Sequence, residues 1–99
     1  MNAMNELNNL NEVVERLQVD LIGSAGRVNY YADKKDYGRN RVNYGCASCS
    51  ADLLRRLGHV ITLNTWGDDE GFLRNEKLTI DGKEIAVKHP STRAAVAGA

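Results

Sequence analysis

The sequence predicts an α+β fold: a long N-terminal helix, one short central helix and a small, mainly antiparallel sheet that ends in a β-hairpin. Three features predict it, namely a heptad-spaced apolar stripe, a later leucine-rich segment, and alternating apolar residues around Asp81-Gly82. The 99 residues are enough for one domain. We expect that domain to span residues 1–89, with residues 90–99 as a flexible C-terminal tail.

An apolar stripe with a period near 3.5 residues predicts an amphipathic helix over residues 3–21. Its members alternate in steps of three and four, and they are Leu7, Leu10, Val14, Leu17 and Leu21. Gly23 and Gly26 follow as the expected stop signal. A stripe this narrow fits a helix lying on a sheet or a coiled-coil seam. We therefore expect these five residues to form an interaction surface.

Residues 27–45 combine basic and aromatic side chains. Arg27-Val28-Asn29-Tyr30 recurs as Arg41-Val42-Asn43-Tyr44, and the polar residues between the copies predict two short extended segments around a loop. Arginines with tyrosines clamp phosphates and stack on bases, so this segment is a candidate contact for nucleic acid or for a partner protein. The candidate residues are Arg27, Tyr30, Lys34, Lys35, Arg39, Arg41 and Tyr44. The alternative is a solvated loop whose tyrosines pack against the core.

Residues 49–57 predict the second helix, with Ser48 or Ser50 as its N-cap and Gly58 just past its end. Its expected buried face holds Leu53, Leu54 and Leu57.

The rest of the chain predicts strands and turns. Residues 59–63 are expected to form a strand, and residues 67–71 a turn. Asp81-Gly82 lies between the alternating segments 78–80 and 84–87, and this pattern predicts a two-residue hairpin.

Cys46 and Cys49 are the only two cysteines, and we expect them at the start of the second helix. A thiolate there is stabilised by unpaired backbone N–H groups and the helix dipole. The stretch from Tyr44 to Cys49, with the following Leu53-Leu54-Arg55-Arg56-Leu57-Gly58, resembles a glutaredoxin active site. This resemblance implies a small dithiol oxidoreductase in which Cys46 attacks and Cys49 resolves.

The chain departs from that family because no proline separates Cys49 from the Asp81-Gly82 hairpin, where the family places a cis-proline. Free cysteine also packs readily as a small apolar side chain, and burial is the interpretation that we favour for both thiols.

Zinc is the cofactor that a Cys-x-x-Cys pair would take. The candidate ligands are Cys46, Cys49, His59 and His89. Their spacing matches no standard zinc motif. The expected cofactor content is therefore none, with a zinc-binding module as the alternative.

Lysines and arginines number 13, as do aspartates and glutamates, so the net charge is zero. No global field attracts nucleic acid or membrane, and copies of the chain repel one another little. No apolar run approaches the roughly 18 residues of a membrane span. There is also no phosphate-binding glycine pattern and no recognisable catalytic set.

These features predict a non-enzymatic interaction or assembly protein, a structural or accessory subunit of the kind that phages encode. Its expected partners are itself or another protein, with nucleic acid as a further option and no membrane partner. Its expected location is the cytoplasm, or a virion if a phage encodes it.

Overall fold

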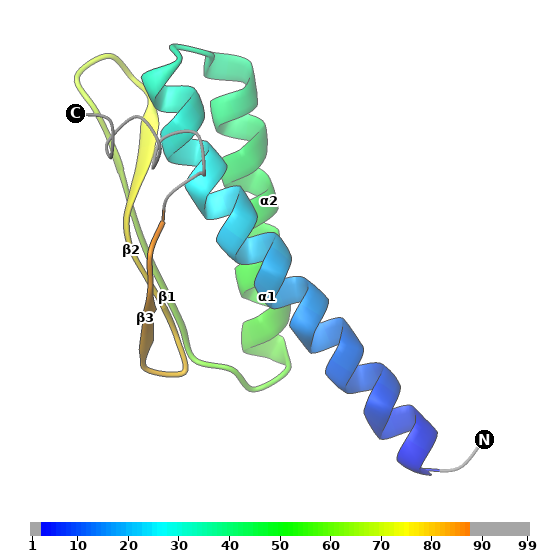
Figure 1. Cartoon of the computed structure of the whole chain (residues 1–99). Coiled ribbons are helices and arrows are strands. Elements are labelled where there is room, and N and C mark those ends of the chain that lie inside the picture. The colour runs from blue at the N-terminus through cyan, green and yellow to red at the C-terminus, as the bar shows by residue number, and fades with distance from the viewer. Residues whose placement is uncertain (1–2, 88–99) are drawn as a thin grey trace, which may run out of the picture.

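The computed structural model describes residues 3–87, with side chains from residue 9 onward, and it confirms the α+β class (Figure 1). Two helices precede one antiparallel sheet of order β1-β2-β3. The elements are α1 (Ala3–Asp33), α2 (Tyr37–Arg56), β1 (Ile61–Gly67), β2 (Leu73–Ile80) and β3 (Lys83–Ile85). The predicted C-terminal tail lies outside the described residues.

Helix α1 continues through Gly23 and Gly26 to Asp33, so the expected stop at the glycines is wrong. Gly26 is buried, and so are Ala47 and Ala51 of α2. Small residues let two helices approach closely, and a glycine inside a helix costs only about 1 kcal/mol relative to alanine. Packing of α1 against α2 outweighs that cost.

Helix α2 begins at Tyr37 rather than at residue 49, and its N-cap is Asp36 rather than Ser48 or Ser50. The Asp36 side chain accepts a hydrogen bond from the backbone N–H of Arg39 at 3.1 Å. The end of α2 is as predicted, because Gly58 follows it with a φ of 95°.

The two Arg-Val-Asn-Tyr segments are both helical, so the expected pair of extended segments is wrong. They face each other across the contact between α1 and α2. Arg27 Nε donates to Asn43 Oδ1 at 2.8 Å and joins the first copy to the second.

The predicted hairpin is confirmed. Ile80 pairs with Lys83 across Asp81-Gly82, whose φ angles of 52° and 85° suit a type I′ turn. Strand β1 begins at Ile61 and ends at Gly67, whereas the sequence predicted a strand over residues 59–63.

The core lies between one face of the sheet and the two helices (Figure 1). Its buried residues are Leu21, Ala25, Ala47, Ala51, Leu54, Ile61, Leu78 and Ile80. Leu54 lies in it as expected, whereas Leu53 and Leu57 are each 43% exposed and the expectation for them is wrong.

Candidate functional site

The first turns of α1 project past the end of α2 and away from the sheet (Figure 1). Val14 and Leu17 pack against the core and Leu21 is fully buried, but Leu10 is 46% exposed. Val13, which the heptad pattern omits, is 50% exposed beside it. The predicted interaction stripe therefore divides into a covered part and an uncovered part. The Leu7 side chain lies outside the described residues.

Charged side chains accompany this projecting part of α1. Glu12, Glu15 and Asp20 are exposed, and Arg16 lies among them. None of these four forms an ion pair with another residue of the described chain. The segment is thus apolar on one side and carries a net negative charge.

Helix α2 carries a second apolar row on its outer side. The row consists of Val42, Cys46, Cys49 and Leu53, and all four are exposed. Steps of four, three and four residues place them along one line of the helix. Sequence reasoning missed this row because the predicted helix began at residue 49, although the spacing itself is visible in the sequence.

Both expectations for Cys46 and Cys49 are wrong. The thiols lie in the middle of α2, so the unpaired N–H groups of a helix start do not reach them. They are also exposed rather than packed in the core. The arrangement leaves two accessible thiols on a regular helix.

The four candidate zinc ligands are not brought together. His59 lies beyond α2, where its Nδ1 is 2.8 Å from Asp81 Oδ2. This contact, with the Val60 N–H bonded to the same carboxylate, lowers the pKa of Asp81. Among the side chains that the structure describes, no three His, Cys, Asp or Glu residues could hold a metal ion together. His89 lies outside the described residues.

The basic and aromatic side chains gather at the turn between α1 and α2, where they contact one another. Lys34 Nζ is 5.5 Å from the centre of the Tyr30 ring, and Arg41 Cζ is 4.9 Å from that of Tyr37. The carboxylate of Glu70 forms an ion pair with Lys35. Cation–π contacts and ion pairs thus engage these cations within the chain.

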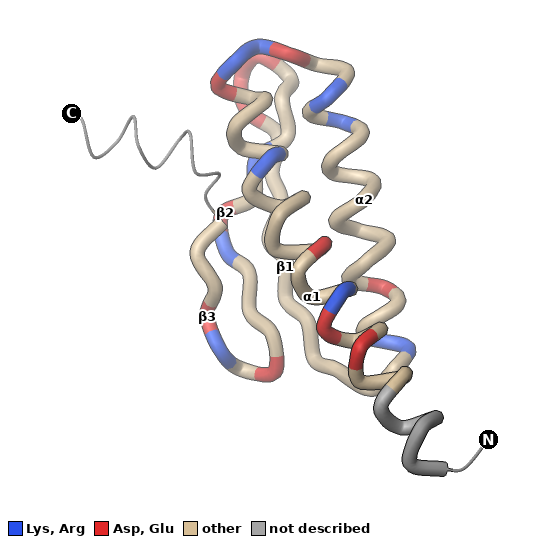
Figure 2. Tube along the Cα trace, turned by 45° about the vertical axis from the view of Figure 1, so that its right-hand side comes forward, with Lys and Arg blue, Asp and Glu red and all other residues tan. Residues whose placement is uncertain are grey.

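Acidic residues balance the charge at the same end. Asp36 pairs with Arg39, and Figure 2 shows both signs of charge interleaved around this turn. Of the other predicted contact residues, Arg27 is bonded to Asn43 and Tyr44 is half-buried. The turn does not present the unbalanced positive surface that phosphate binding requires.

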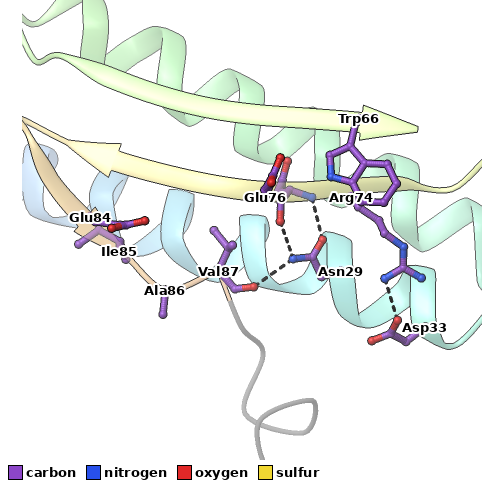
Figure 3. Close-up of a pocket in the computed structure, with 10 residues that line it drawn as sticks. Asn29, Asp33, Trp66, Arg74, Glu76, Glu84, Ile85, Ala86 and Val87 are labelled. Carbon is purple, nitrogen blue, oxygen red and sulfur yellow. Dashed lines mark hydrogen bonds and ion pairs between the residues drawn. The ribbon is translucent and has the colours of Figure 1, made fainter. Parts of the chain in front are cut away.

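An open hollow of about 820 Å³ lies between α1 and the strands β2 and β3 (Figure 3). Asp33 and Arg74 form an ion pair at one end of it, and the described chain ends at Val87 on its rim. Its other lining residues are Asn29, Trp66, Asn75, Glu76, Glu84, Ile85 and Ala86. Polar groups of the lining are bonded to one another, as Asn29 is to Asn75 and Arg74 to Asp33.

The candidate functional surfaces are therefore the projecting part of α1 and the outer row of α2. No helix in the described part of the chain is long and apolar enough to cross a membrane. The chain matches no protein-family model, no curated protein and no solved structure.

Proposed function

We propose that this protein is a non-enzymatic assembly subunit that self-associates through the projecting part of α1. The observation that carries the proposal is the exposure of Leu10 and Val13 on a helical segment that extends beyond the core. Burying an aliphatic side chain of this size contributes about 1.5–3 kcal/mol. Two or more such residues per copy supply a substantial part of the free energy of association.

A second copy is the occupant that the charge balance favours. The chain has zero net charge, so two copies approach without overall repulsion. The turn between α1 and α2 is a weaker docking surface, since its cations are already engaged by Tyr30, Tyr37 and Glu70.

The test is sedimentation velocity over a range of concentrations. Leu10→Asp combined with Val13→Asp is expected to abolish association, because a charge in an apolar contact loses its hydration. The matched control is Val19→Asp, since Val19 is also exposed but lies about 180° around the helix from Leu10. Circular dichroism checks that all variants keep the fold. A wild-type chain that stays monomeric at every concentration would contradict the proposal.

A further inference from the structure

The outer row of α2 is a second apolar surface without a partner in the described chain. Val42 is 65% exposed and Leu53 43% exposed, and the exposed thiols of Cys46 and Cys49 lie between them. The opposite side of α2 already covers the core, and its buried residues are Asn40, Ala47, Ser50, Ala51 and Leu54. Helix α2 thus has one apolar side for its own core and another that faces outward.

The charges of this helix complement those of the projecting part of α1. Residues 37–56 contain four arginines and one aspartate, a net charge of +3, whereas residues 3–13, which precede Val14, contain two glutamates and no basic residue, a net charge of −2. Opposite net charges on the two helical segments attract each other and favour their approach.

The lengths of the two surfaces also agree. From Val42 to Leu53 the row extends about 16 Å along α2, at 1.5 Å per residue. Val14 is the first of the described side chains of α1 that packs on the core, and the part of the helix that precedes it is about 15 Å long. Because α1 is one continuous helix that leads away from the molecule (Figure 1), this part cannot fold back onto α2 of its own chain.

We infer that the outer row of α2 binds the projecting part of α1 of a second copy, and this inference rests on the proposed self-association. When two copies bind each other reciprocally, the contact closes as a two-fold dimer, and when they bind head to tail it continues as a chain. In both arrangements the contact covers Cys46 and Cys49.

Thiol alkylation tests the inference directly. In the assembled wild-type protein, Cys46 and Cys49 are expected to react with iodoacetamide at least tenfold more slowly than in the Leu10→Asp and Val13→Asp double variant at the same concentration. An assembled protein whose thiols react as fast as those of the monomer would overturn the inference but not the proposed self-association. A wild-type chain that is monomeric throughout would overturn both.

Disulfide mapping tests which surfaces meet. Val13→Cys and Glu15→Cys place a new thiol at positions about 200° apart on α1. Mild oxidation uses copper phenanthroline, which accepts two electrons per bond while the two thiol protons pass to the buffer. Under these conditions Val13→Cys is expected to link to Cys46 or Cys49 of a second copy. Glu15→Cys is expected to link at least fivefold less. Links that join Cys46 to Cys49 between copies, equally in both variants, would identify a contact between two α2 helices and overturn the inference.

Discussion

Asn29 and Asn75 are joined by two hydrogen bonds that reproduce the pairing of neighbouring β-strands. Asn29 Nδ2 donates to Asn75 O at 2.9 Å, and Asn75 N donates to Asn29 Oδ1 at 2.7 Å. Strand β3 pairs with residues 78–80, and within the described residues 3–87 no strand lies on that side of the first half of β2. A side-chain amide of α1 takes the place of the missing strand and satisfies its backbone groups.

Asn40 of α2 forms the same pair of bonds with Leu73. Its Nδ2 donates to Leu73 O at 2.9 Å, and Leu73 N donates to its Oδ1 at 3.0 Å. The Asn40 Nδ2 group also donates to Val28 O at 2.8 Å. One fully buried side chain thus joins α1, α2 and β2.

Asn40→Asp is expected to lower the free energy of unfolding by about 3 kcal/mol, because an ionised carboxylate cannot donate to the carbonyl oxygens of Val28 and Leu73. Urea denaturation followed by Trp66 fluorescence measures the change. The matched control is Asn64→Asp on the exposed side of β1, for which a change within about 0.5 kcal/mol is expected. Equal losses in the two variants would contradict this account of Asn40.

Much of the fold class could be predicted because its signals are local. The Asp81-Gly82 turn specifies its own hairpin through two residues that tolerate positive φ, and Gly58 ends α2 for the same reason. The contacts of Asn29 and Asn40 could not be predicted, since their partners lie 46 and 33 residues away in the chain.

The predicted helix boundaries are wrong for a related reason. Gly23 and Gly26 stop an isolated helix, but here α1 packs against α2 over the same residues and continues. Because α2 begins at Tyr37 instead of residue 49, Cys46 and Cys49 lie along the side of a helix and not at its start. The α1 stripe was visible in sequence, but only the packing shows which of its residues the core leaves exposed.

Gly82→Ala is expected to destabilise the fold by about 1–2 kcal/mol, since Gly82 has a φ of 85° and an L side chain is strained there. Gly45→Ala is the opposite case. Gly45 lies inside α2, and a Cβ added to it meets nothing within 4 Å, so the substitution is expected to stabilise the fold by about 0.5–1 kcal/mol. Urea denaturation of both variants, at a concentration where the chain is monomeric, measures the two shifts. Shifts of the same sign would contradict this explanation.

The carboxylate of Asp81 is expected to contribute to stability above about pH 4 and to lose that contribution in acid. The hydrogen bond with His59, and then that from the Val60 N–H, lower the pKa of Asp81 below its ordinary value. A group whose pKa is lower in the folded chain stabilises it above the unfolded pKa, and the effect disappears as pH falls through the folded pKa.

Urea midpoints measured between about pH 2.5 and 6 test this dependence. Asp81→Asn keeps a residue that tolerates the positive φ of the turn but removes the titrating group. The urea midpoint of this variant is therefore expected to fall less steeply as the pH is lowered. Some fall of the urea midpoint in acid should remain, because the Arg39 side chain likewise lowers the pKa of Asp36. An unchanged slope in Asp81→Asn would contradict the role of Asp81.

Cys46 and Cys49 are expected to resist forming a disulfide with each other while α2 is intact. Residues three apart on a helix have Cβ atoms about 5–6 Å apart, whereas a disulfide requires about 3.5–4.5 Å. Both thiols are accessible, so geometry rather than burial limits the reaction. Oxidation of the folded, monomeric chain should therefore leave two free thiols, while oxidation in urea should lower the mass by about 2 Da as the bond forms. Intact mass measured after quenching with an alkylating reagent separates the two results. A folded monomer that oxidises as fast as the unfolded chain would mean that α2 opens readily around residues 46–49.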